Sequence, residues 1–131
     1  GGSDDEKGYG GLCARIKMPD DLVFFSTNGP VQPQTLQVVA GPWMDFSGSL
    51  GSGGKQHGLA ILCHPGTPNY PAPWILRQKN SMQNIVYPGR DAVEISTDQP
   101  VKLKYRLILH TGNAGSIDLD KLQAEYGSAV F

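Results

Sequence analysis

The stretch His57-Gly-Leu-Ala-Ile-Leu-Cys-His64-Pro-Gly-Thr-Pro-Asn-Tyr-Pro-Ala-Pro-Trp74-Ile-Leu-Arg77 decides the fold of this chain. Its first part is an apolar run that ends on His64, which is typical of a buried strand. Four prolines and a glycine then fix the backbone of the connection, and a second strand begins at Trp74. Because connections are usually mobile, one this constrained is expected to hold functional side chains in place.

Residues 101–110 have the clearest strand pattern elsewhere in the chain. Apolar residues occupy every second position from Val101 to Leu109, and Lys102, Lys104 and Arg106 lie between them. Strict alternation of this kind is typical of a strand with one buried and one polar face. Its length suits one layer of a β-sandwich.

Shorter strands are predicted on both sides of these segments. They lie at 12–17, 22–27, 35–40, 43–47, 85–87 and 92–96. Turn signals such as Asn28-Gly-Pro30 and Pro88-Gly89 separate them. The one segment with a helical pattern is 116–126, for which Ser116 or Asp118 is the N-cap. We therefore predict an all-β protein, an antiparallel β-sandwich with one short C-terminal helix.

The composition limits the class of protein. The 131 residues suffice for one domain with a single core, placed at 8–131, and residues 1–7 are interpreted as a linker or tag remnant. With 11 basic and 12 acidic residues, the net charge of −1 argues against a nucleic-acid surface. No apolar run is long enough to span a membrane. The 17 glycines and 10 prolines are typical of a turn-rich β protein.

The cysteines leave the cellular compartment open. Cys13 and Cys63 both lie in apolar strand patterns, where a free cysteine behaves as a small buried hydrophobe. A disulfide between them is the alternative. No signal peptide is visible in this sequence. Secretion or a periplasmic location is favoured over the cytoplasm.

The common motifs for phosphate, metal and serine-nucleophile chemistry are incomplete. The glycine-rich segment 48–55 suggests a phosphate-binding loop, but Gln56 stands where that motif needs serine or threonine. His57, His64 and His110 are widely separated and lack the spacing of paired metal ligands. The Gly-x-Ser-x-Gly elbow of many hydrolases does not occur. We therefore expect no metal and no cofactor.

His64 is the strongest candidate for catalysis, because Pro65 fixes the backbone beside it. An imidazole transfers protons near neutral pH, so His64 is a candidate acid or base, and a histidine bonded to its own loop is the alternative. Asp45 and Arg15 lie within strand patterns, where a charge needs a partner or a polar cleft. They form either a structural ion pair or part of the site, with Asp45 as catalytic partner and Arg15 as substrate ligand.

The proline-rich loop and the strand after it supply the other candidate substrate ligands, Asn69, Tyr70, Trp74 and Arg77. An exposed indole beside a rigid loop offers a stacking surface for a sugar ring. For Trp74, a place in the core is the alternative. Arg77 is a candidate to bind a substrate hydroxyl or carboxylate, with simple solvation as the alternative.

A series of motifs occurs in a familiar order. They are Gly8-Tyr-Gly-Gly-Leu-Cys-Ala-Arg15, Trp43-x-Asp45-x-Ser-Gly48, Gly58-Leu-Ala-Ile-Leu-Cys-His64-Pro65, Pro68-Asn69, Pro73-Trp74 and Tyr105-Arg-Leu…His110-x-Gly112. Together they resemble the PmoA-like family, named after methane oxygenase, over roughly 7–126. The resemblance implies a β protein of unestablished activity, similar to one half of a galactose-mutarotase-like supersandwich. It also implies that this chain is the C-terminal portion of a longer protein, completed by an N-terminal half or a second copy.

Two functions follow from these observations. The first is a carbohydrate-binding protein or a hydrolase, in which His64 performs acid–base chemistry on a saccharide. The second is a non-catalytic binding or assembly module that pairs with another chain through its sheet edges and the proline-rich loop. The two readings share one fold, so the fold alone does not separate them.

Overall fold

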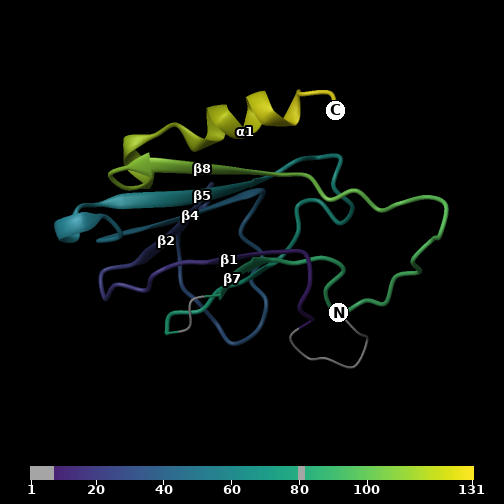
Figure 1. Ribbon diagram of the computed structural model, residues 1–131, viewed down its shortest axis with the longest axis horizontal. Coiled ribbons are helices and arrows are strands. Elements are labelled where there is room, and N and C mark those ends of the chain that lie inside the picture. The colour runs from purple at the N-terminus through teal and green to yellow at the C-terminus, as the bar shows by residue number, and fades with distance from the viewer. Residues whose placement is uncertain (1–7, 80–81) are drawn as a thin grey trace.

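The computed structural model describes residues 8–79 and 82–131, which form two β-sheets and one helix in three layers (Figure 1). The strands are β1 (Leu12–Arg15), β2 (Val23–Ser26), β3 (Gly29–Val31), β4 (Trp43–Gly48), β5 (His57–Cys63), β6 (Trp74–Ile75), β7 (Met82–Ile85) and β8 (Tyr105–Thr111). Short 3₁₀ turns η1 (Ser52–Gly54) and η2 (Ala114–Ser116) precede β5 and the helix α1 (Leu119–Gly127). The predicted all-β sandwich with one short C-terminal helix is confirmed.

The larger sheet has the strand order β3-β2-β4-β5-β8, and every pair in it is antiparallel. The apolar run of β5 lies near its centre, with β4 on one side and β8 on the other, which explains why this strand is buried on both faces. Among the described strands, β8 has a neighbour on one side only and forms an edge of the sheet.

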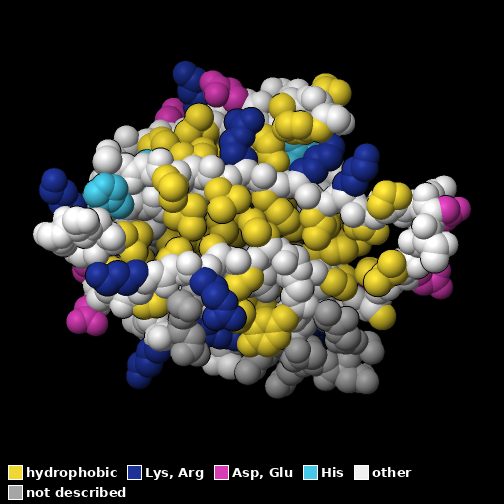
Figure 2. All heavy atoms as spheres, viewed as in Figure 1, with side chains coloured by type: hydrophobic (Ala, Val, Ile, Leu, Met, Phe, Trp, Pro, Cys, Tyr) yellow, Lys and Arg dark blue, Asp and Glu magenta, His cyan; other side chains and the backbone are white. Residues whose placement is uncertain are grey.

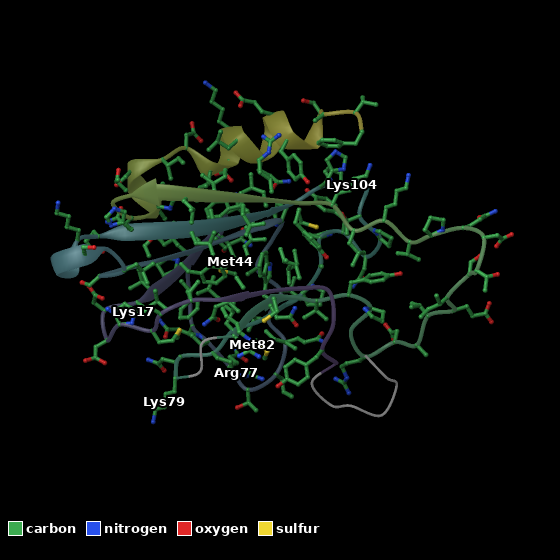
Figure 3. All side chains as sticks on the ribbon, viewed as in Figure 1. Lys17, Met44, Arg77, Lys79, Met82 and Lys104 are labelled. Carbon is green, nitrogen blue, oxygen red and sulfur yellow. The ribbon has the colours of Figure 1, made fainter. Side chains whose placement is uncertain are left out.

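The smaller sheet, in the order β1-β7-β6, packs against the inner face of the larger one. The core between the two sheets holds Trp74 and Ile85 from the smaller sheet with Phe24, Met44 and Phe46 from the larger. Figure 3 shows Met44 between the two layers. Burial of these large apolar side chains is the main force that holds the sheets together.

Helix α1 covers the outer face of the larger sheet (Figure 1). Asp118, one of the two predicted N-caps, accepts a hydrogen bond from the backbone N–H of Lys121. Leu119 and Tyr126 pack on Trp43 and its neighbours, and the Trp43 indole N–H donates to a carboxylate oxygen of Asp120 at 2.8 Å. Trp43 is therefore a core residue between the larger sheet and the helix.

Several predicted element boundaries are wrong. The pattern at 35–40 gives only an isolated bridge between Val38 and Trp74, because that segment runs along the edge of the smaller sheet. The strand expected at 85–87 is β7, which lies earlier. Residues 92–96 form no strand and are exposed, and residues 101–104 run outside β8. The helix predicted from residue 116 begins only at Leu119, because Ser116 is the last residue of the turn η2.

Candidate functional site

His64 has structural partners at both ring nitrogens. Nδ1 accepts a hydrogen bond from the backbone N–H of Gly66 at 2.9 Å, and Nε2 lies 3.0 Å from the carbonyl oxygen of Ala129. Since Nδ1 accepts and a carbonyl can only accept, the ring carries its proton on Nε2. The His64 ring also contacts the rings of Tyr126 and Phe131 edge to face. His64 therefore joins the loop after β5 to the C-terminal tail. Its bond to Gly66 is the one expected of a histidine bonded to its own loop.

Trp74 lies in the core and not on the surface. Its side chain is fully buried between the sheets, and its indole N–H donates to the carbonyl oxygen of Gly41 at 3.0 Å. The expected exposed stacking surface for a sugar is therefore wrong. The indole serves the core, where its large area and its one polar group are both used.

Asp45 is fully buried on β4, and its partners are Ser47 and His110. The Ser47 hydroxyl donates to one carboxylate oxygen, and the other lies 2.6 Å from Nε2 of His110. Arg15 is exposed on β1, in the other sheet, so the expected ion pair between Arg15 and Asp45 is not formed. Nor is Asp45 the partner of His64, whose ring nitrogens bond elsewhere.

The pair of Asp45 and His110 depends on the glycine between them. Ser47, Gly58 and His110 occupy neighbouring positions across β4, β5 and β8 on the outer face of the sheet. A Cβ at Gly58 would collide with the His110 ring, so the ring reaches Asp45 only because residue 58 has no side chain. Only 6% of the His110 side chain is exposed. The sequence analysis did not predict the cluster of Asp45, Ser47 and His110. The one sequence feature that could have indicated it is Gly58, a glycine inside an apolar strand.

The remaining predicted ligands lie apart from His64. Arg77 donates to the carbonyl oxygens of Gln34 and Thr35 and to the hydroxyl of Tyr9, all on the side of the smaller sheet. Figure 3 shows Arg77 on this side and Lys104, whose carbonyl binds the backbone of His64, near the end of helix α1.

Asn69 and Tyr70 remain on the surface. Tyr70 is 37% exposed, and Asn69 has a left-handed backbone with φ of 69°. The residues predicted as one site are therefore distributed over both sheets and the core, and they do not open onto a common cleft.

Asn69 lines a polar hollow of about 470 Å³. Arg90 and Asp91 contribute the charged groups of its wall, and Pro73 and Pro88 contribute its apolar surface. A carboxylate, an amide and a guanidinium around a small hollow are groups that hydrogen-bond polar ligands. We call this the Asn69 hollow.

The inner side of β8 is left uncovered by the smaller sheet at Leu107 and Leu109. Leu107 is 51% and Leu109 is 83% exposed, although both share the face that elsewhere forms the core. An apolar hollow of about 520 Å³ adjoins Leu109, and its wall also includes Ile16, Leu50 and Leu59. Figure 2 shows hydrophobic atoms in a broad band across this side of the molecule. We call Leu107, Leu109 and the unpaired edge beside them the β8 face.

Asp21 anchors the loop that forms one wall of this apolar hollow. Its carboxylate accepts hydrogen bonds from the hydroxyl and the backbone N–H of Ser49 and from the side-chain amide of Gln56. These bonds stabilise the ionised form, so the pKa of Asp21 lies below its ordinary range. The loop that carries Leu50 is therefore held in place beside the β8 face.

The described residues contain neither a cluster of metal ligands nor a disulfide. Between 8–79 and 82–131, no group of three or more metal-binding side chains lies together. Cys13 and Cys63 are both free, so the alternative of a disulfide between them is wrong. Burial raises the pKa of the Cys63 thiol, which keeps it protonated and unreactive. No helix in the described part of the chain is long and apolar enough to cross a bilayer.

Comparison with known proteins gives one match. The sequence profile of a family of unknown function, DUF6807, matches residues 2–124. No curated protein and no solved structure matches the chain significantly. The resemblance to the PmoA-like family stays a prediction.

Proposed function

The chain belongs to DUF6807, a family of unknown function, and we propose that it is a non-catalytic binding and assembly module whose β8 face takes up a β-strand of another polypeptide. The observation that carries the proposal is the bare apolar side of an edge strand, with Leu109 83% exposed. Natural proteins usually cover or shorten such edges, because the free N–H and C=O groups pair readily with another strand. An added strand would satisfy these groups and shield the leucines.

The charges beside β8 indicate the chemistry of that strand. Lys104 precedes β8 and Arg106 lies within it, in the alternate positions that face away from the core side. An added strand would complement both sides of β8 if its acidic residues lay on the outer side, with Lys104 and Arg106, and its apolar residues on the inner side, with Leu107 and Leu109. A second basic strand would place like charges near one another, which is unfavourable.

Catalysis receives less support from the same geometry. The ring nitrogens of His64 are both bonded to backbone groups, and Trp74 is sealed in the core. Asp45 and His110 are nearly free of solvent contact, where a substrate would not reach them directly. A binding role for the exposed β8 face requires no rearrangement of these groups.

A labelled peptide that alternates valine and glutamate tests the proposal. We expect it to bind the protein at least about tenfold more tightly than a matched valine–lysine peptide, because only the first complements Lys104 and Arg106. Fluorescence anisotropy measures the affinity. Hydrogen exchange then checks that the amides of β8 become protected by the acidic peptide.

Leu109→Lys provides the matching variant, since it places a charge on the β8 face at an exposed position that does not disturb the core. Binding should weaken at least about tenfold, as expected when the contact of a leucine side chain is lost. Val39→Lys is the control, because Val39 is 84% exposed on a segment next to the smaller sheet. Equal loss in both variants, or binding without protection of β8, would contradict the proposal.

The Asn69 hollow supports a second candidate function, the binding of a saccharide. The polar groups of Asn69, Arg90 and Asp91 surround a hollow of about 470 Å³, and prolines supply an apolar surface beside them. Sugar hydroxyls need such donors and acceptors, and carboxylate hydrogen bonds are the strong ones. In this candidate function the sugar would bind at Asn69, away from His64 and Trp74.

Calorimetric titration with mono- and oligosaccharides tests this candidate. Asn69→Gly removes the amide while tolerating the left-handed backbone, and Asp91→Ala removes the carboxylate. Each variant should lose at least about tenfold in affinity for any sugar that the unchanged protein binds. Asp98→Ala is the control, because Asp98 is exposed in the same segment and does not line the hollow. A lack of binding to the whole panel would eliminate this candidate.

A further inference from the structure

The segment 92–96 has the properties expected of the missing strand. It forms no helix, strand or turn in the single protomer, and Val93 and Ile95 are 43% and 87% exposed. Glu94 lies between them, so apolar side chains alternate with an acidic one. The segment belongs to the long connection between β7 and β8, which runs outward from the body of the molecule (Figure 1).

We infer that a second copy of this chain occupies the β8 face, with segment 92–96 of each protomer paired with β8 of the other. The inference rests on the proposed function, for which it names the partner. Two exposed features of one chain, a bare strand edge and a bare strand-like segment, complement each other in this arrangement. Each is left without regular pairing in the described structure of the single protomer.

The side-chain patterns match in an antiparallel pair. With Val93 opposite Leu109, Ile95 lies opposite Leu107, and all four apolar side chains fall on the inner face. Glu94 then lies on the outer face, diagonally next to Arg106. A pair of two β8 strands would instead bring basic strands together, so the charges favour exchange of the acidic segment over direct contact between β8 edges.

The exchange is symmetric, so one dimer contains two such strand pairs. A two-fold axis relates them, and each protomer gives one segment and receives one. The second pair forms within an already associated complex, which raises its effective concentration and strengthens the dimer beyond a single peptide contact. This predicts that the whole protein associates more tightly than an isolated peptide of residues 90–98 binds to it.

Analytical ultracentrifugation over a concentration series tests the exchange with two variants. Leu109→Lys damages the receiving face and Ile95→Lys damages the donated segment, and each alone should raise the dimer dissociation constant at least about tenfold. In an equal mixture, the two variants also form a heterodimer. In it, the intact segment 92–96 of the Leu109→Lys protomer can pair with the intact β8 face of the Ile95→Lys protomer. The mixture should therefore associate more tightly than either variant alone, whereas Val39→Lys should behave as the unchanged protein.

The possible outcomes separate the inference from the proposed function. A monomer at all concentrations would overturn the exchange, and the proposed function would still stand if the acidic peptide bound to β8. A dimer that is sensitive to Leu109→Lys but not to Ile95→Lys would also overturn it, because that pattern indicates direct contact between two β8 faces. The exchange would also be overturned if the mixture of the two variants dimerised no more tightly than either variant alone. Failure of the peptide to bind, together with a monomeric protein, would remove both.

Discussion

The change of His110 to alanine is expected to lower the free energy of unfolding by about 3–5 kcal/mol, the usual cost when a buried charge loses its partner. His110 covers a carboxylate oxygen of Asp45 at 2.6 Å, and Asp45 has no exposed surface. Without the ring, the carboxylate would stay buried with Ser47 as its remaining partner. Urea unfolding, with the slope compared between variants, measures the loss.

His57→Ala is the matched control for His110. His57 lies on the neighbouring strand β5 and is half-buried, and its ring contacts only the backbone oxygen of Lys55 among the bonds described. We expect this change to cost less than about 1 kcal/mol. The double variant His110→Ala/Asp45→Asn should recover part of the lost stability, because the buried charge is gone. Equal costs for His57→Ala and His110→Ala would contradict the buried pair.

The sequence predicts the strands that find partners within the chain. Alternation and apolar runs located β1, β2, β4, β5 and most of β8, because those side chains are buried by neighbours close to them in the sheet. The same alternation at 92–96 gave no strand in the single protomer. A pattern shows which face of a strand is apolar, but pairing depends on whether another strand is present to receive it.

The candidate site was harder to predict than the fold, because its partners are set by sheet register. Asp45 and His110 are 65 positions apart, and their contact follows from the pairing of β4, β5 and β8. Local spacing gives no sign of such a contact. His64 is the reverse case. Its position after a strand and before a proline suggested catalysis, but the contact of its ring with the C-terminal tail could not be predicted from local sequence.

Trp74→Ala is expected to lower the free energy of unfolding by about 3–5 kcal/mol, the range measured when large aromatic residues are removed from a core. The indole fills the space between the two sheets, and its loss leaves a cavity there and also removes the hydrogen bond to Gly41. Thermal and urea unfolding followed by circular dichroism measure the change.

Tyr70→Ala separates a core role for Trp74 from a role in ligand binding. Tyr70 belongs to the same proline-rich loop and is 37% exposed, so its removal should change stability by less than about 0.5 kcal/mol. A surface platform for a sugar would give the reverse pattern for Trp74→Ala, with stability retained and binding lost. Because the indole has no exposed surface from which to contact a ligand, we expect Trp74→Ala to lower stability. A folded Trp74→Ala variant of unchanged stability would contradict the packing described for this core.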